Sequence, residues 1–145
     1  MRTAFLVACV ASLGMLGSCQ DKESSGKPVL TGTRWMLVQV EDTPLSISSY
    51  SDTYRSYLQF TENNRTEGLG PCNSFGGTYT LGASGGTLRI SEQAATRINC
   101  AALGIETLYL NALPRTVSYE VKDRELRLFD ASNSLKPLLL FRAAE

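Results

Sequence analysis

Short runs of alternating apolar and polar residues, separated by turn-forming residues, fill the chain from Leu30 onward. An alternation with a period of two is typical of strands that turn one face toward a core. The pattern predicts strands at residues 35–40, 57–61, 65–70, 77–81, 87–90, 117–121, 125–129 and 136–142. The run LLLF at 138–141 is apolar on both faces, which indicates a strand covered on both sides. The sequence therefore predicts a mainly β domain.

One segment, from Ala101 to Leu113, changes to a helical period and ends at Pro114. The face that we expect to pack on the sheet carries Ala101, Ile105, Leu108 and Ala112. Together the patterns predict a small, largely antiparallel β-barrel with one α-helix packed on it. Large side chains expected to point inward argue against a roomy cavity; they are Trp35, Phe60, Leu88, Tyr119, Leu128 and Phe141.

The first 29 residues follow a different pattern. Arg2 precedes an apolar run that is shorter than the roughly 20 residues a membrane-spanning helix needs, which predicts a signal peptide over 1–18. Residues Leu16 to Cys19 resemble a bacterial lipobox, which implies that Cys19 becomes the lipid-modified first residue. The polar stretch that follows predicts a flexible tether over 19–29, so the folded domain covers 30–145.

A lipid anchor at Cys19 implies a place in the cell envelope. Several acyl chains such as palmitate hold a protein on a membrane permanently, whereas a single chain binds reversibly. No aspartate follows Cys19 directly, and lipoprotein sorting then favours the outer membrane of a Gram-negative bacterium. The membrane is the first expected partner, a protein of the envelope is the second, and we expect the chain itself to be a monomer.

Charge and composition remove several function classes. The chain carries 14 Lys and Arg against 14 Asp and Glu, so we expect no nucleic-acid partner. It has no histidine, which excludes His-dependent nucleophiles and the commonest zinc ligand. Carboxylates that we expect to be solvated charges are Glu41, Asp42, Glu62, Glu67, Glu120, Asp123, Glu125 and Asp130. We therefore expect a protein that is not an enzyme, with no catalytic residue, metal or cofactor.

Cys72 and Cys100 remain in the domain once Cys9 is assigned to the signal and Cys19 to the lipid site. An exported domain lies in an oxidising compartment, so a structural disulfide is expected. In the chain-entropy account, closing a loop of this length stabilises a fold by roughly 3–4 kcal/mol. The alternative is a redox-active pair with Cys100 near a helix N-terminus, although the spacing is unlike Cys-x-x-Cys.

Two motifs carry a family resemblance. GPCNSFGGTY at 70–79 and ATRINC at 95–100 resemble the two signatures of the META domain, or HslJ-like, family. Their matching residues are Cys72, Asn73, Gly77, Tyr79, Thr96 and Cys100. LTGTRW, ELRLFD and LLLFR resemble the family's opening and closing strands in the same order. Pro71 and the pair Ile98-Asn99 depart from the usual residues, so the local turn geometry is expected to differ.

The resemblance implies that Cys72 and Cys100 bond to each other and that the fold is a lipocalin-like small barrel. It also implies an envelope lipoprotein or secreted protein associated with stress tolerance, without established enzymatic activity. From the residue types, we expect Asn73 to accept a left-handed φ and to cap local backbone groups. Gly77 should allow a close approach, and Tyr79 offers an apolar ring with a hydroxyl.

Three functions remain open. The first is a non-enzymatic envelope lipoprotein that contacts other proteins, for which the segment Ser46 to Ser56 offers an adaptable recognition loop or simply a solvated one. The second is a barrel that binds a small apolar molecule. The third is a thiol oxidoreductase that uses Cys100.

Overall fold

The computed structural model describes residues 27–45 and 55–145. Its sheet is antiparallel, with the strand order β6-β5-β4-β3-β1-β10-β9-β8, while β2 pairs with β1 and β7 pairs with β5 off this path. The strands are β1 (Arg34–Val40), β2 (Thr43–Pro44), β3 (Tyr57–Phe60), β4 (Arg65–Leu69), β5 (Ser74–Leu81), β6 (Leu88–Ile90), β7 (Ala94–Ala95), β8 (Ser118–Lys122), β9 (Glu125–Phe129) and β10 (Leu139–Ala143). The helix α1 (Leu103–Ala112) and the 3₁₀ helix η2 (Leu113–Arg115) connect β7 to β8.

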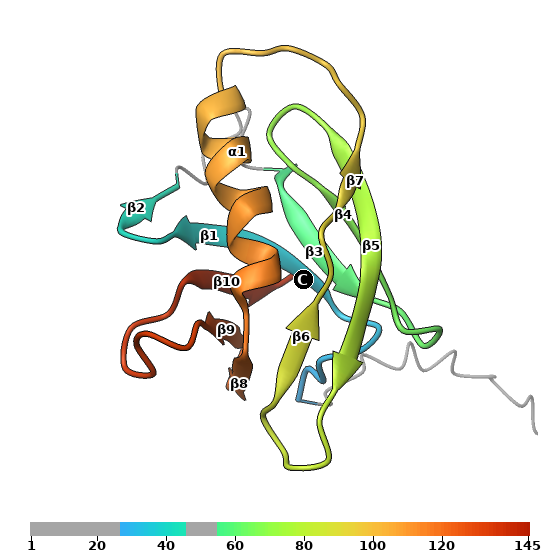
Figure 1. The fold of residues 1–145 in the computed structure, drawn as a ribbon, viewed down its shortest axis with the longest axis vertical. Helices are drawn as coiled ribbons and strands as arrows, with labels where there is room; N and C mark the ends of the chain where they lie inside the picture. The colour runs from blue at the N-terminus through green and yellow to red at the C-terminus, as the bar shows by residue number, and fades with distance from the viewer. Residues whose placement is uncertain (1–26, 46–54) are drawn as a thin grey trace, which may run out of the picture.

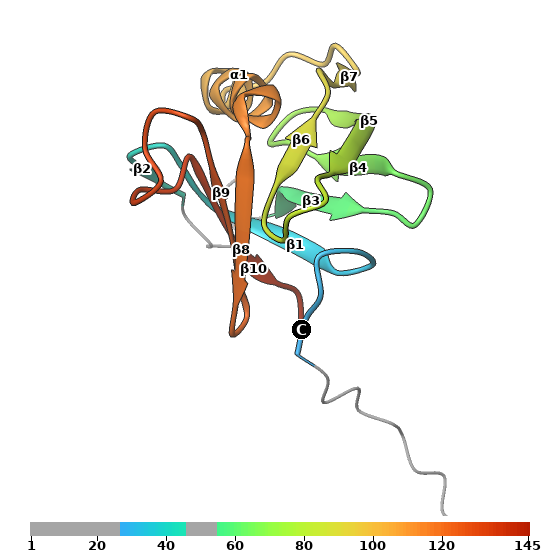
Figure 2. The same cartoon turned by 60° about the horizontal axis from the view of Figure 1, so that its bottom comes forward.

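The two ends of the sheet approach each other. The main-chain N–H of Leu88 donates to the Val117 carbonyl at 3.1 Å, and that of Tyr119 donates to the Gly86 carbonyl at 2.7 Å. These bonds bridge the two ends of the sheet next to β6 and β8, so the barrel is nearly closed. Figure 1 shows α1 beside the sheet, and Figure 2 shows the strands curling around a common interior. The predicted antiparallel barrel with one helix is confirmed.

Side chains from the strands fill the interior of the barrel. Trp35, Phe60 and Phe141 are fully buried, and the indole N–H of Trp35 donates to the Leu30 carbonyl at 3.0 Å. Of the six residues predicted to point inward, five are fully buried. Tyr119 is only partly buried and packs at the margin of the core. The alternating pattern therefore identified most of the interior correctly.

The helix begins later than predicted and buries a different face. Its buried residues are Glu106, Tyr109 and Ala112, whereas Leu108 is 42% exposed. The predicted face was wrong, although Ala112 belongs to both faces and Ile105 is half-buried. The physical reason is that Glu106 hydrogen-bonds a neighbouring turn and Tyr109 fills space in the core. Hydrogen-bond partners and shape, more than hydrophobicity alone, select the face.

All eight predicted strands are present, with changed ends. β5 begins at Ser74 and β10 begins at Leu139, three residues before and three residues after the predicted starts. β2 and β7 were not predicted, because two residues cannot display a period. Both strands exist through their pairing with longer strands, which a local pattern does not contain.

The predicted signal peptide, the lipid site at Cys19 and residues 46–54 of the expected recognition loop lie outside the described residues. Among the helices that the structure describes, none has the length and apolar character needed to cross a membrane.

Tyr109 should tolerate loss of its hydroxyl better than loss of its ring. The ring meets Phe75 edge-on with centroids 5.4 Å apart, and its hydroxyl is buried without a hydrogen-bond partner among the described residues. We predict that Tyr109→Phe is at least as stable as the wild type at pH 7, whereas Tyr109→Ala loses about 3–5 kcal/mol. Urea unfolding of the three proteins measures both differences.

Alkaline pH provides a second readout for the same residue. Burial, and to a smaller extent Tyr57, raises the pKa of Tyr109 well above its ordinary value. The folded state therefore resists ionisation, and the wild type loses stability as the pH rises above about 10, the ordinary tyrosine pKa. Tyr109→Phe should lose less stability than the wild type as the pH rises above about 10. If Tyr109→Phe is less stable than the wild type by more than about 1 kcal/mol at pH 7, the prediction is wrong and the hydroxyl makes a favourable interaction.

Candidate functional site

The carboxylate of Glu106 lies at the centre of a buried polar cluster. It projects from the first turn of α1 toward the turn before β5. Its Oε2 accepts hydrogen bonds from the main-chain N–H groups of Cys72 at 2.8 Å and Asn73 at 2.7 Å, and its Oε1 accepts one from Asn73 Nδ2 at 2.5 Å. The residue is only 3% exposed. Three N–H donors thus replace the water that a buried carboxylate loses.

Asn73 uses its whole hydrogen-bonding capacity. Its Nδ2 donates to Glu106 and to the Ile98 carbonyl at 2.9 Å. Its Oδ1 accepts from the Thr96 hydroxyl at 2.7 Å and from the Ile98 N–H at 2.6 Å. An amide offers two donors and two acceptor lone pairs, so all four are filled. Asn73 therefore joins α1 to the segment that follows β7.

The disulfide between Cys72 and Cys100 links the same turn to the chain just before α1, with the two Cα atoms 5.8 Å apart. A Cβ placed on Gly70 would lie 2.5 Å from Glu106 Oε2, so a side chain there would displace the carboxylate. We call Gly70, Cys72, Asn73, Thr96, Cys100 and Glu106 the Asn73 cluster. The expected disulfide is present, and Cys100 lies beside the start of α1, because its carbonyl accepts from the Leu103 N–H at 3.2 Å.

The other two family-motif residues lie along β5. At Gly77 an added Cβ would meet the side chains of Gln93 and Ser91, which is the close approach that the sequence predicts. Tyr79 is buried, packs edge-on against Phe60 with centroids 5.0 Å apart, and donates its hydroxyl to the Thr61 carbonyl at 2.9 Å. Both residues support the sheet and lie apart from the Asn73 cluster.

Two sequence interpretations change at this cluster. Asn73 does not use the left-handed φ that its residue type tolerates, since the non-glycine residues with positive φ in the described chain are Glu41, Asn64 and Asp123. Its side chain bonds a distant segment instead of its own turn. Glu106 was missed, because the residue patterns in the sequence assigned no role to it. The available signal was that Glu106 is the one charged residue between Ala101 and Leu113.

The polar groups and sulfurs of the Asn73 cluster bond to one another and so hold separate chain segments together. The side-chain hydrogen bonds of Glu106 and Asn73 join members of the cluster to one another and to the main chain of Ile98, and both sulfurs are in the disulfide. In residues 27–45 and 55–145, no group of three or more Cys, Asp or Glu side chains is placed to hold a metal ion. The arrangement fixes the end of β5, the 95–100 segment and α1 in one geometry.

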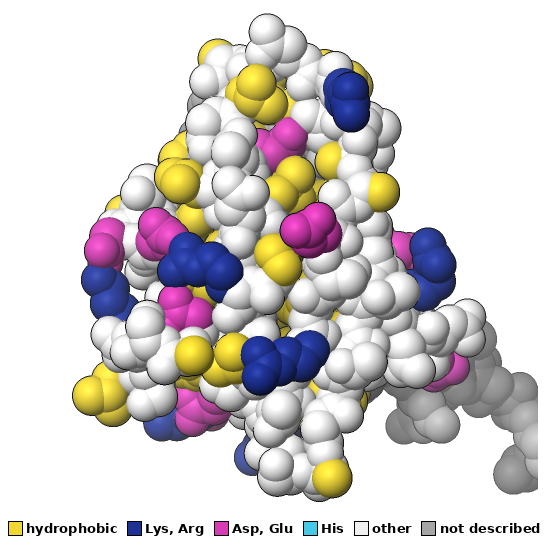
Figure 3. Space-filling view, viewed as in Figure 1, with side chains coloured by type: hydrophobic (Ala, Val, Ile, Leu, Met, Phe, Trp, Pro, Cys, Tyr) yellow, Lys and Arg dark blue, Asp and Glu magenta, His cyan; other side chains and the backbone are white. Residues whose placement is uncertain are grey.

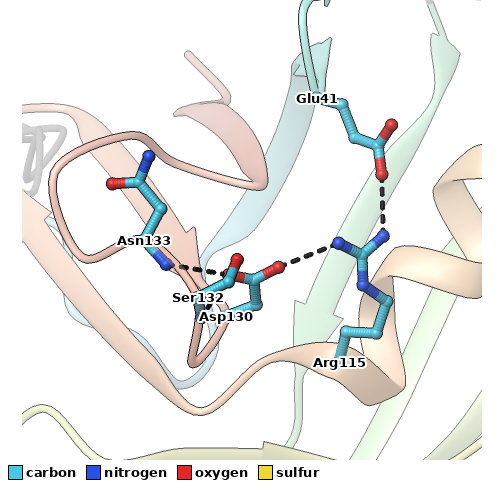
Figure 4. A network of polar contacts seen from close by, with 5 residues as sticks. All are labelled: Glu41, Arg115, Asp130, Ser132 and Asn133. Carbon is cyan, nitrogen blue, oxygen red and sulfur yellow. Dashed lines mark hydrogen bonds and ion pairs between the residues drawn. The ribbon is translucent and has the colours of Figure 1, made fainter.

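A second polar network lies beside η2 and lines a hollow of about 310 Å³. Arg115 donates to Glu41 at 2.7 Å and to Asp130 at 2.8 Å (Figure 4). Lys136 pairs with Asp42. Each charged side chain that lines the hollow is thus paired with another one. Exposed pairs of this kind contribute about 0–1 kcal/mol each, so we interpret the network as a clamp between loops.

A more apolar groove borders the Asn73 cluster. It has a volume of about 280 Å³ and lies between α1 and the segment after β7. Its lining includes Thr96, Ile98, Leu103, Glu106 and Leu110. Figure 3 shows hydrophobic side chains gathered between α1 and β7 on this face. Asn73, Thr96 and Glu106 of the cluster therefore line part of this groove, but their polar atoms are hydrogen-bonded to other groups of the protein.

Comparison with known proteins gives a family and a fold. The sequence profile of the META domain matches residues 28–145. An NMR structure of a protein from Burkholderia xenovorans is similar, with 24% identity over 79% of this chain and 83% of that chain and a TM-score of 0.58. A crystal structure of a DUF4847 family protein from Bacteroides vulgatus is similar with 11% identity over 80% and 94% of the two chains and a TM-score of 0.56. Both show a likeness of fold alone, and no curated protein matches the chain.

Replacing Glu106 by Gln should destabilise the domain strongly. Glutamine keeps the shape but turns an NH₂ group toward N–H donors, either the two main-chain groups or Asn73 Nδ2. Hydrogen bonds to a charged group are worth about 1.5–3 kcal/mol, so we expect a loss of at least about 2 kcal/mol in urea unfolding. Glu92→Gln, at an exposed position, is the matched control and should change stability by less than about 0.5 kcal/mol. Equal stabilities for the two variants would contradict the role of Glu106.

Asp130 should titrate at unusually low pH. The Ser132 hydroxyl first, and the Arg115 guanidinium second, lower the pKa of Asp130 to about 2. Its stabilising contribution is therefore present above the ordinary value of about 3.9 and is lost as the pH falls through the folded pKa. We expect Ser132→Ala to raise this pKa at least as much as Arg115→Gln, as measured by NMR titration of the carboxyl carbon. Ser134→Ala, in the same loop, should leave it unchanged.

Proposed function

Because the chain belongs to the META domain family, we propose that it is a lipid-anchored protein of the bacterial cell envelope whose domain acts by contacting another protein. In this proposal the barrel is a rigid scaffold, and its outer surface carries the function. The domain is not an enzyme and needs no cofactor. Family resemblance further suggests a role under stress.

The observation that carries this proposal is the filled interior. Trp35, Phe60, Tyr109 and Phe141 are all fully buried and occupy the space in which a ligand-binding barrel of this size holds its ligand. The hollows described above have volumes of about 280 and 310 Å³ and open to the surface. Pockets for drug-sized ligands are commonly about 300–1,000 Å³, so these two hollows lie at the lower end of that range or just below it. Contact through the outer surface is the function that such a solid domain supports best.

The anchor is supported by the sequence alone. The lipobox ends at Cys19, and the domain's first strand begins at Arg34. A polar tether of about ten residues reaches roughly 30 Å when it is extended, at about 3.3–3.6 Å per residue. This length is sufficient to hold the domain clear of the lipid headgroups, where it could meet soluble or membrane proteins of the envelope.

The thiol-redox alternative has less support. Cys72 and Cys100 are bonded to each other within a cluster whose remaining polar atoms hydrogen-bond one another. Catalytic thiols lie in exposed, electropositive surroundings, whereas the turn that carries Cys72 binds the Glu106 carboxylate, whose Oε2 accepts from the Cys72 N–H at 2.8 Å. The negative charge disfavours a thiolate. A structural disulfide is the better interpretation.

Lipid attachment is tested by expressing the full chain in a Gram-negative bacterium with an alkyne analogue of palmitate. We predict that the wild type takes up the label and is found in the membrane fraction, whereas Cys19→Ala does neither. Cys9→Ala is the matched control, because Cys9 belongs to the segment that is removed, and it should behave as the wild type does. Label on Cys19→Ala, or none on the wild type, would contradict the proposed anchor.

The same preparation distinguishes a scaffold from a ligand-binding barrel. The native mass of the purified lipoprotein should equal the denatured mass, which includes the lipid and one disulfide. A further mass that is released on denaturation would favour the small-molecule alternative and would overturn the scaffold proposal.

A further inference from the structure

The outer edge of β7 has main-chain groups that no strand pairs. In the described sheet β7 pairs with β5 only, with Phe75 opposite Ala95 and Gly76 opposite Ala94. The Thr96 N–H donates to the Ser74 carbonyl at 3.0 Å, so Thr96 and Ser74 form a hydrogen-bonded pair. Ala95 and Phe75, the next two residues to face each other, then form a non-hydrogen-bonded pair. Because such pairs alternate along antiparallel strands, the N–H and carbonyl of Ala95 point away from β5. They form the beginning of an open edge.

The open edge continues past the end of β7. The Ile98 N–H and carbonyl both bond the side chain of Asn73, as described above. By the same alternation, the main chain of Arg97 faces outward, like that of Ala95. All six residues from Ala94 to Asn99 are exposed. The Asn73 cluster thus binds the stretch of chain that follows β7 from one side, and the main-chain groups of Ala95 and Arg97 face the other side.

An apolar groove lies along this edge. The opposite wall is α1, from which Leu103 and Leu110 line the groove, and Ile98 lines the near wall. Ile98 is 60% exposed and Leu103 is 39% exposed, although both are large apolar residues. The volume of about 280 Å³ accommodates one or two side chains and is too small for a typical drug-sized ligand.

The fixed charge at the rim of the groove is positive. Arg97 lines the groove, is exposed, and forms no ion pair or side-chain hydrogen bond with the described residues. The Glu106 carboxylate lies at the floor but is buried and bonded to Cys72 and Asn73. Glu92 is also exposed, but it does not line the groove. Charge complementarity therefore favours an acidic group beside an apolar one.

We propose that an extended acidic segment of another protein adds as a strand to the outer edge of β7, with one apolar side chain in the groove and one carboxylate at Arg97. This inference rests on the proposed function and identifies the surface and the partner chemistry. Main-chain hydrogen bonds to Ala95 and Arg97 supply the alignment, as they do in other cases of strand addition. The groove and the guanidinium supply the selectivity for side chains.

A displayed library of random nonapeptides, selected on the purified full chain, tests the proposal. We expect the selected peptides to combine an apolar residue with a nearby Asp or Glu. On binding, the largest amide shifts in NMR spectra should occur at Ala95, Arg97 and Leu103. A selection without binders, or binders whose shifts lie on another face, would overturn the proposal.

Two substitutions address the two parts of the contact. Ala95→Pro removes an N–H that the pairing with β5 does not use, and it should weaken binding of a selected peptide at least tenfold. Arg97→Glu should weaken binding about fivefold or more, since an exposed pair is worth up to about 1 kcal/mol and the reversal adds repulsion. Arg89→Glu, an equal charge reversal on an exposed position of β6, is the matched control and should bind as the wild type does. Thermal unfolding confirms that each variant is folded. Binding unaffected by both Ala95→Pro and Arg97→Glu would contradict the proposal.

A photo-crosslinking amino acid in the lipid-anchored chain separates failure of this inference from failure of the proposed function. It is placed at Ala95 or, for comparison, at Glu67, an exposed position of β4. Crosslinks from Ala95 that the selected peptide competes away support the docking edge. Crosslinks from Glu67 alone would overturn this inference and leave the proposed function standing, and crosslinks from neither position would count against both. A dimer of the chain that Ala95→Pro abolishes would assign the edge to a second copy and overturn the proposal of another protein.

Discussion

The burial of one carboxylate is the constraint on which the rest of this domain's outer structure depends. Glu106 can be buried because two main-chain N–H groups and the Asn73 amide point at it. Those donors belong to the turn before β5, in which the Gly70 N–H donates to the Asn73 carbonyl at 2.7 Å. The carboxylate fits beside this turn because Gly70 has no side chain. Removing one member leaves the others buried and unpaired, which costs more than the bond itself contributes.

The same constraint explains how the barrel meets its helix. α1 has one buried polar anchor, Glu106, and one large buried ring, Tyr109, one turn further on. The anchor sets the rotation of the helix about its axis, and the ring completes the core against Phe75 and Phe141. Leu103 and Leu108 are left partly exposed as a result. An apolar outer face here is thus a consequence of how the helix is fixed, and it supplies one wall of the groove.

The disulfide and the hydrogen bonds of Asn73 constrain the 95–100 segment in different ways. The covalent bond at Cys100 limits the distance between segments, while the Asn73 amide fixes the orientation of the chain at Ile98. An extended segment held from one side presents its other side to solvent. Natural sheets usually cover or shorten such edges, and β7 is only two residues long. So short an edge offers little main chain for edge-to-edge aggregation, which is consistent with its being left open.

The local pattern of residues was sufficient to predict the strands, the position of the helix in the chain and most of the core. Alternation places Trp35, Phe60 and Phe141 inside because a strand turns successive side chains to opposite faces, whatever the rest of the chain does. The motif residues also identified the region of the cluster. The role of Asn73 was only partly predictable, since the hydrogen-bond partners of its side chain are 23 or more residues away in sequence.

By itself the sequence determined a mainly β domain with one helix, the place of that helix between strands, and the pair of cysteines. Tertiary structure alone decided which helix face is buried, where Glu106 points and which edge of β7 remains open. The physical reason is that strand periodicity is a local property of the chain. Satisfying a buried carboxylate requires donors from another segment, and pairing or leaving open an edge depends on which strand lies beside it.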